Sequence, residues 1–151
     1  MATIFTCATE ADTRAVGRRL ASLLRAGDIV LLAGDLGAGK TVFASGIAEG
    51  LGVQDPVVSP SFVLVRRYVG LMSMIHADLY RLGSSGEIDD LDLASDAAEG
   101  VLVVEWGDVS EQSFGDDHLM VTITLDDEGV RTLRLRPRGS WESRRLPEGA
   151  G

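Results

Sequence analysis

Residues 28–41 read DIVLLAGDLGAGKT, and this stretch decides the fold. Its first part, Ile29 to Ala33, is an unbroken apolar run rich in branched side chains, which predicts a strand buried on both faces. Residues 34–41 fit the pattern GxxxxGK[ST], and residues 42–51 have the apolar spacing of a helix. A buried strand, a glycine-rich turn and a helix in this order are the context that a phosphate-binding loop requires.

The residue types in this loop are those that binding of a polyphosphate requires. Gly34, Gly37 and Gly39 carry no Cβ, so the backbone can take positive φ angles and approach a polyphosphate closely. The loop N–H groups then point into one concavity at the positive end of a helix dipole. The pattern assigns Lys40 to the β- and γ-phosphates and the Thr41 hydroxyl to Mg²⁺. The predicted nucleotide contacts in the loop are Asp35, Leu36, Gly37, Ala38, Gly39, Lys40, Thr41 and Val42.

The composition describes an acidic chain of single-domain size. It has 151 residues, a net charge of −9 and one cysteine, Cys7, so no internal disulfide can form. Residues 82–130 contain fourteen Asp or Glu and no Lys or Arg, which disfavours a nucleic-acid surface there. This acidic run is either a solvated face or a surface that steers a basic protein partner. No apolar run is long enough to span a membrane and the N-terminus resembles no signal sequence, so we expect a cytoplasmic protein.

Periodicity and turn residues predict the elements around the loop. We expect strands over 2–7, 62–69, 72–77, 101–106, 118–125 and 130–136, and helices over 9–25, 42–51 and a short stretch after Ser84 or Ser85. Thr9 is the predicted N-cap of the first helix, with Asp12 as its capping-box partner. The last two strands, joined by the turn 126–129, are expected to form an antiparallel hairpin.

These elements predict an α/β protein of the P-loop NTPase type. We expect a three-layer α/β/α domain over residues 1–137, with a mainly parallel sheet plus antiparallel hairpin strands. Residues 138–151 have no periodicity and are predicted to form a flexible tail. Trp141 in this tail either folds back onto the domain or touches a partner.

Two acidic residues follow predicted strands and are candidates for the metal. Phosphate-loop hydrolases hold Mg²⁺ with the loop Ser/Thr and an acid at the end of a neighbouring apolar strand. Glu105 directly follows four apolar residues, and Asp78 follows the strand predicted just before it. Because strand ends on the C-terminal side of an open α/β sheet form the ligand crevice, we expect both carboxylates there. The alternatives are a helix N-cap or surface acid for Glu105 and an ion pair with Arg81 for Asp78. His76, in register with Asp78, is interpreted as a packed or hydrogen-bonded strand residue.

Three classes of phosphate-loop protein compete. A regulatory GTPase reads guanine with Asn-Lys-x-Asp, which this chain cannot contain because Lys40 is its only lysine. A small-molecule kinase closes an arginine-bearing lid over the phosphates. Residues 82–130, where that lid would lie, have no arginine, although Arg66, Arg67 and Arg81 remain as possible clamps. The third class is an ATPase that serves a partner complex. A nucleotide-binding protein that acts through its bound state alone also remains open.

Four motifs resemble the TsaE (YjeE) family of bacterial proteins in order and spacing, over most of the chain from about Thr9 to Leu125. They are GDLGAGKT at 34–41, SPSF at 59–62, HADLYRL at 76–82 and EW at 105–106. The resemblance implies a phosphate-loop fold and an ATPase that is weak alone and associates with the TsaB–TsaD pair. That complex transfers a threonylcarbamoyl group to the adenosine next to the anticodon of tRNA, so contact with tRNA would be indirect.

The family pattern also implies roles for single residues, with ATP and Mg²⁺ as the cofactors. Lys40, Asp78 and Glu105 are the predicted catalytic residues, and Thr41, Glu105 and Asp78 are the predicted metal ligands. Trp106 is assigned to the nucleotide site. Ser61, where the family usually has Thr, keeps the hydroxyl expected near the γ-phosphate.

Overall fold

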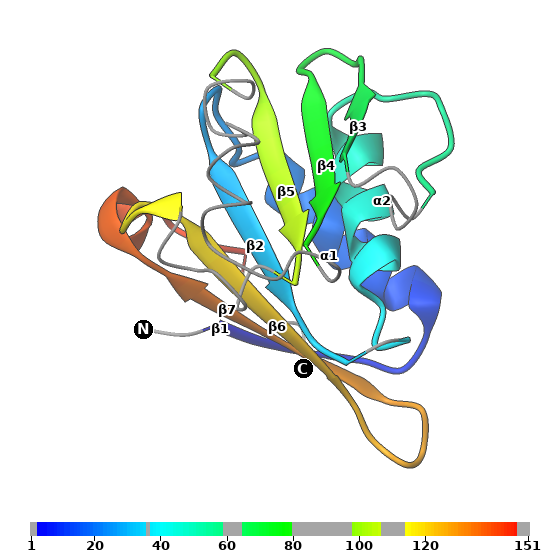
Figure 1. Ribbon diagram of the computed structural model, residues 1–151. Coiled ribbons are helices and arrows are strands. Elements are labelled where there is room, and N and C mark those ends of the chain that lie inside the picture. The colour runs from blue at the N-terminus through cyan, green and yellow to red at the C-terminus, as the bar shows by residue number, and fades with distance from the viewer. Residues whose placement is uncertain (1–2, 36, 59–64, 80–97, 107–113, 148–151) are drawn as a thin grey trace.

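The computed structural model describes residues 3–35, 37–58, 65–79, 98–106 and 114–147. Its described strands form one mixed sheet of seven strands in the order β1-β7-β6-β2-β5-β4-β3 (Figure 1). The elements are β1 (Thr3–Cys7), α1 (Glu10–Ala21), β2 (Ile29–Ala33), α2 (Lys40–Gly50), β3 (Val65–Tyr68), β4 (Met74–Asp78), β5 (Val101–Glu105), β6 (Leu119–Leu125), β7 (Arg131–Pro137) and the 3-10 helix η2 (Gly139–Ser143). The helix predicted after Ser84 or Ser85 lies outside the described residues.

The parallel centre of the sheet leads into the phosphate loop. β2 pairs in parallel with β5 on one side and with β6 on the other, and β4 pairs in parallel with β5. Every residue of β2, β4 and β5 is buried, as expected for strands covered on both faces. Their C-terminal ends meet at one edge, at the lower ends of these arrows in Figure 1, near the start of α2. β1, β3 and β7 pair antiparallel with their neighbours, which confirms the predicted fold class.

The two described helices pack against each other on one face of the sheet, behind the strands in Figure 1. The predicted capping box begins α1: the Thr9 hydroxyl accepts the Asp12 N–H at 3.1 Å, and the Asp12 carboxylate accepts the Thr9 N–H at 3.2 Å. Gly17 permits the close helix packing, because a Cβ there would lie 2.5 Å from the carbonyl oxygen of Phe43.

The end of α1 differs from the prediction. The helix ends at Ala21 instead of continuing to about Arg25. The N–H groups of Leu23 and Leu24 bond to carbonyls three residues earlier, so the last turn tightens. The Asp28 carboxylate then accepts the Arg25 N–H at 2.6 Å, which stabilises the turn that directs the chain into β2.

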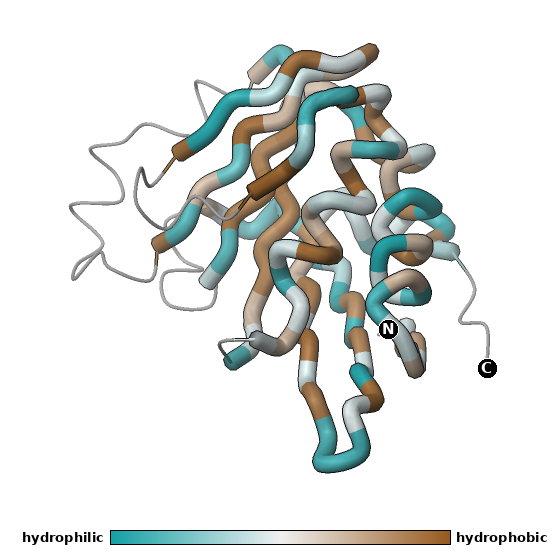
Figure 2. Tube along the Cα trace, turned by 90° about the vertical axis from the view of Figure 1, so that its right-hand side faces the viewer, coloured by the Kyte–Doolittle hydropathy of each residue, from teal (hydrophilic) through white to brown (hydrophobic). Residues whose placement is uncertain are grey.

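Apolar side chains fill both faces of the sheet. The helix face contains Val30, Leu32, Leu119, Val121 and Leu133 among others, and the opposite face contains Leu31, Leu102, Val104, Phe114 and Met120. Figure 2 shows hydrophobic residues along the central strands and hydrophilic residues at the tip of the β6–β7 turn. Cys7 lies in the helix-side core, where burial raises the pKa of its thiol. Neither described helix has the length and hydropathy needed to cross a membrane.

The segment after β7 packs onto the domain. The prediction of a flexible tail is therefore wrong for residues 138–147, which include η2. Trp141 is 1% exposed and belongs to the helix-side core. Arg144 stacks on the Trp141 ring at 4.0 Å and bonds to both carboxylate oxygens of Asp28, at 2.6 and 2.7 Å. These bonds to Asp28 raise the pKa of Arg144. Trp141 and the ion pair between Arg144 and Asp28 hold this segment against the domain. Neither contact produces a periodic pattern in the sequence.

Candidate nucleotide-binding site

The glycine-rich loop has the backbone that its sequence predicts. Gly34, Gly37 and Gly39 have φ angles of 149°, 80° and 116°, and α2 begins directly after Gly39. A Cβ at Gly34 would collide with the carbonyl oxygen of Ile123, and one at Gly39 would lie 2.9 Å from Nε of Arg131. At Gly37 a Cβ would meet nothing within 4 Å, so this part of the loop borders open space. Glycine is required by the Ile123 backbone at Gly34 and by φ at all three positions, whereas the Arg131 side chain beside Gly39 could shift.

Lys40 lies inside the loop that precedes it. Its ammonium group donates to the carbonyl oxygens of Gly34 at 2.6 Å and Asp35 at 2.9 Å. It also lies 3.9 Å from the ring centroid of Trp106, a cation–π contact. Trp106 has a positive φ of 65°, which is uncommon for a bulky residue and indicates a constrained position after β5. These contacts hold the lysine at the N-terminus of α2, where the residue is only 4% exposed.

Thr41, Glu105 and His76 form a connected set of polar groups. The Thr41 hydroxyl lies 3.2 Å from Oε1 and 3.0 Å from Oε2 of Glu105. His76 Nε2 lies 2.6 Å from the same Oε2. Glu105 is 4% exposed and His76 is fully buried, so these contacts replace the water that the carboxylate loses. The structure therefore brings the predicted metal ligands Thr41 and Glu105 into direct contact.

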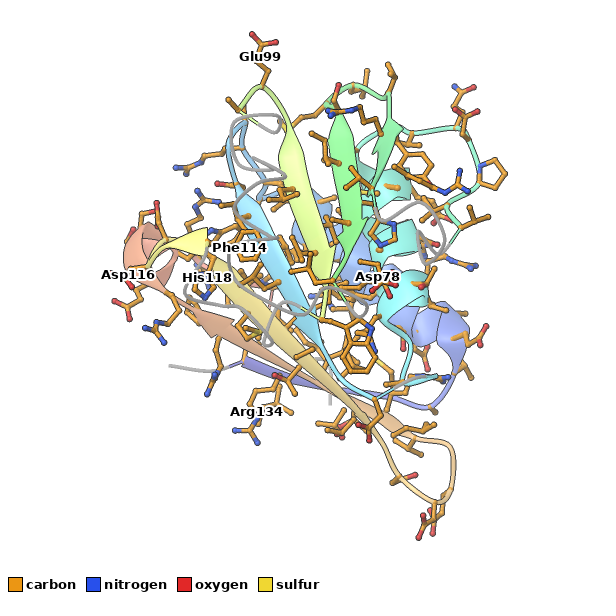
Figure 3. The ribbon with its side chains drawn as sticks, viewed as in Figure 1. Asp78, Glu99, Phe114, Asp116, His118 and Arg134 are labelled. Atoms are coloured by element: carbon orange, nitrogen blue, oxygen red, sulfur yellow. The ribbon has the colours of Figure 1, made fainter. Side chains whose placement is uncertain are left out.

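Asp78 and Glu105 end neighbouring strands side by side. They are partners in the parallel register of β4 and β5, so their side chains emerge at the same sheet edge. Both line a cavity of about 320 Å³ together with Lys40 and Thr41. Figure 3 shows Asp78 at the end of β4 near the start of α2. The crevice expected from the strand ends is present.

Most of the predicted site residues gather around this cavity. Of the predicted residues, its lining includes Gly37, Gly39, Lys40, Thr41, Val42, Asp78, Glu105 and Trp106. Asp35 and Ala38 instead line an adjoining hollow of about 470 Å³, which also contacts Trp106 and the end of β6. Leu36 and Ser61 lie outside the described residues.

Two cavity residues were not predicted. Glu10, in the first turn of α1, and Arg131, at the start of β7, both line the cavity. The Arg131 Nη2 atom lies 4.0 Å from Glu10 Oε1, and its Nε–H donates to the carbonyl oxygen of Ala38 at 2.8 Å. Their distance along the chain from the loop explains why no local pattern indicates them.

Comparison with known proteins places the chain in a family. Residues 7–133 match the sequence model of the threonylcarbamoyl adenosine biosynthesis protein TsaE. The chain belongs to the TsaE family. It is 51% identical over 111 residues to the tRNA threonylcarbamoyladenosine biosynthesis protein TsaE of Mycobacterium leprae, covering 67% of this chain and 69% of that protein. It is 37% identical over 133 residues to the protein of the same name from Bacillus subtilis, covering 85% of this chain and 82% of that protein.

A solved structure extends the likeness to three dimensions. The crystal structure of YdiB from Bacillus subtilis superposes with a TM-score of 0.79 at 28% identity, covering 94% of this chain and 90% of that one. The TsaE match over residues 7–133 includes the loop, Asp78, Glu105 and Arg131. It ends before Trp141 and Arg144, so the packed C-terminal segment lies beyond the matched region.

Proposed function

We propose that this TsaE-family protein binds ATP with Mg²⁺ at the phosphate loop and hydrolyses it in support of a TsaB–TsaD complex. One observation carries the proposal: Lys40, Thr41 and Glu105 converge at the start of α2, where the loop N–H groups also lie. An ammonium group, a hydroxyl and a carboxylate at a helix N-terminus are the donor and ligand set for a magnesium-bound polyphosphate.

The residues present fit such a ligand. The three loop glycines have the positive φ angles that a phosphate-binding concavity of N–H groups requires, and the space beside Gly37 is open. Mg²⁺ is usually held by one or two protein oxygens plus substrate phosphates, which matches Thr41 and Glu105. When bound, Mg²⁺ supplies charge neutralisation to the phosphate oxygens. The chain's own part is to grip the phosphates through Lys40 and the loop amides.

Asp78 is the proposed residue for the hydrolytic step. It lines the cavity next to Glu105, so its carboxylate borders the space in which a water molecule would be oriented or would give up a proton. The loop amides and Lys40 would still bind phosphate without it. We therefore expect Asp78→Ala to slow hydrolysis more than it weakens binding. The reverse result would make Asp78 a binding or metal residue instead.

The partner complex is inferred from the family. The relatives bear names of tRNA threonylcarbamoyladenosine biosynthesis, and the motifs resemble those of the ATPase that serves TsaB–TsaD. The acidic run over residues 82–130 suits a protein partner better than tRNA itself. The TsaB–TsaD pair is accordingly the proposed partner, with tRNA contacted only through it.

Phosphate release from ATP tests the proposal. The protein is incubated with Mg²⁺ and labelled ATP, alone and with TsaB–TsaD, and compared with Lys40→Ala and the control Arg134→Ala. Arg134 is exposed on β7 and lies away from Asp78 in Figure 3. We expect phosphate release that TsaB–TsaD increases and that Lys40→Ala abolishes. Label transferred to a small metabolite would indicate a kinase, and an unchanged rate in Lys40→Ala would overturn the site.

A further inference from the structure

His76 is a polar side chain in the fully buried centre of the sheet. It is the middle residue of β4 and lies opposite Val103 in the parallel pair with β5. Its strand neighbours Ile75 and Ala77 enter the core on the far face, so the ring points to the face that carries α2. Buried positions in parallel strands are normally apolar, as Met74 is on the same face. The presence of histidine here calls for a specific partner.

That partner is Glu105. The distance of 2.6 Å from His76 Nε2 to Glu105 Oε2 is a short hydrogen bond, and an ionised carboxylate only accepts, so Nε2 is the donor. The other ring nitrogen, Nδ1, is buried and has no hydrogen-bond partner among the described residues. If the histidine served only to fill the core, hydrogen bonds to both ring nitrogens would stabilise it more than one bond does. Here the ring is placed for one bond, to one oxygen of one carboxylate.

The bond distinguishes the two oxygens of Glu105. Oε2 receives His76 and also lies 3.0 Å from the Thr41 hydroxyl, whereas the hydrogen bonds within the described residues give Oε1 only the Thr41 contact at 3.2 Å. A glutamate carboxylate rotates broadly about its last torsion, so an outside donor is needed to fix its plane. We propose that His76 is a positioning residue: it fixes the Glu105 carboxylate so that Oε1 stays available to Mg²⁺ beside Thr41. This inference rests on the proposed magnesium-nucleotide function.

Loss of the His76 hydrogen bond should lower the affinity for Mg²⁺ and leave the metal-free affinity for the nucleotide unchanged. Groups that hydrogen-bond to metal ligands typically change metal affinity by about 10- to 100-fold when removed. In the described part of the chain, His76 hydrogen-bonds to Glu105 and not to the loop amides or Lys40, so metal-free binding of ADP should be unaffected. The side-chain amide nitrogen of Gln reaches about as far as Nε2, whereas that of Asn reaches only about as far as Nδ1.

Magnesium titrations of nucleotide binding test the role. ADP affinity is measured by calorimetry for the wild type, His76→Gln, His76→Asn and His76→Leu, first in EDTA and then across a range of MgCl₂. His118→Leu is the matched control, because His118 is 1% exposed and lies at the start of β6, away from Asp78 in Figure 3. We expect about 10-fold more Mg²⁺ at half-saturation for His76→Asn and His76→Leu, wild-type behaviour for His76→Gln and His118→Leu, and unchanged ADP affinity in EDTA throughout.

Three results would overturn these claims, and they separate the inference about His76 from the proposed function. Equal magnesium dependence in His76→Gln and His76→Asn would overturn the positioning role, and this pair decides even if His76→Leu fails to fold. A wild-type protein that bound no ADP in either condition would overturn the proposed nucleotide function itself. Normal ADP binding with no magnesium shift in His76→Asn would reject only the inference about His76.

Discussion

Arg131 on β7 donates its Nε–H to the carbonyl oxygen of Ala38 in the phosphate loop, across 2.8 Å and 93 positions of sequence. The same side chain packs against Gly39, where a Cβ would lie 2.9 Å from Nε. The antiparallel hairpin therefore contacts the loop directly, although it lies at the flank of the sheet. Loop geometry in this chain depends on a residue outside the loop.

Removing the Arg131 side chain should weaken nucleotide binding. Hydrogen bonds from charged groups contribute about 1.5–3 kcal/mol, and part of that free energy stabilises the loop in its binding shape. We expect Arg131→Ala to raise the Kd for ADP about 10-fold, as measured by calorimetry. Arg134→Ala, three residues along the same strand with its side chain on the other face, is the control. Identical Kd values for the two variants would contradict a role for Arg131 in the loop.

Substitution by alanine should lower the stability of the protein by different amounts at two of the loop glycines. Gly34→Ala forces a positive φ and also drives a Cβ into the Ile123 carbonyl, whereas Gly37→Ala has the φ strain alone. Strain of this kind costs about 1–3 kcal/mol, so Gly37→Ala should unfold at slightly lower urea concentration than wild type. Gly34→Ala should unfold at distinctly lower urea concentration still. Equal midpoints would mean that the β6 backbone yields to the added Cβ.

Nucleotide binding should change the fluorescence of one tryptophan. Trp106 lies against Lys40 and lines the cavity, whereas Trp141 is sealed in the core beside Arg144. An anion bound at Lys40 alters the cation–π environment of the Trp106 indole. We expect ADP to change emission in the wild type and in Trp141→Phe, and to leave it unchanged in Trp106→Phe. A response that survives in Trp106→Phe would place the nucleotide elsewhere.

The C-terminal segment should contribute to the stability of the domain. The side chains of Arg144 and Asp28 are 10% and 9% exposed, so Arg144→Ala leaves a buried carboxylate without its charged partner. Breaking such a pair costs about 3–5 kcal/mol. Urea unfolding should show this loss for Arg144→Ala and almost none for Arg145→Ala, whose side chain is exposed. Matching midpoints for the two variants would show that the segment packs without stabilising the fold.

Acid should loosen the same segment through Asp117. The hydroxyl and N–H of Ser140 donate to its carboxylate at 2.6 and 2.7 Å, and these bonds lower its pKa. Because the folded pKa lies below the unfolded value of about 3.9, the stability from these bonds is present above that value. It is lost as pH falls through the lowered folded pKa. Between pH 5 and about pH 3 the difference in unfolding midpoint between wild type and Asp117→Asn should shrink; a constant difference would contradict this linkage.

Local sequence patterns predicted the phosphate loop and the strand and helix that flank it. The apolar run before Gly34, the glycine spacing and the residues Lys40 and Thr41 are contiguous, and contiguous residues form a strand, turn and helix by short-range sterics and hydrogen bonds. Strand ends located Asp78 and Glu105 for a similar reason, because parallel strands place their C-terminal residues at one edge. The tail was mispredicted because Trp141 and Arg144 pack through single contacts that have no period.

The sequence by itself determined that a phosphate loop joins β2 to α2 and that carboxylates stand at the ends of neighbouring strands. Each of these features is formed by residues that are contiguous in the chain. Only the tertiary structure decided which distant side chains support them. His76 contacts Glu105 because β4 and β5 pair in a particular register. Arg131 contacts Ala38 because β7 returns antiparallel to β6 and so begins near the C-terminal ends of the parallel strands, beside the loop. Contacts of that kind depend on strand order and packing, and these are set by burial over the whole chain and not by any local spacing.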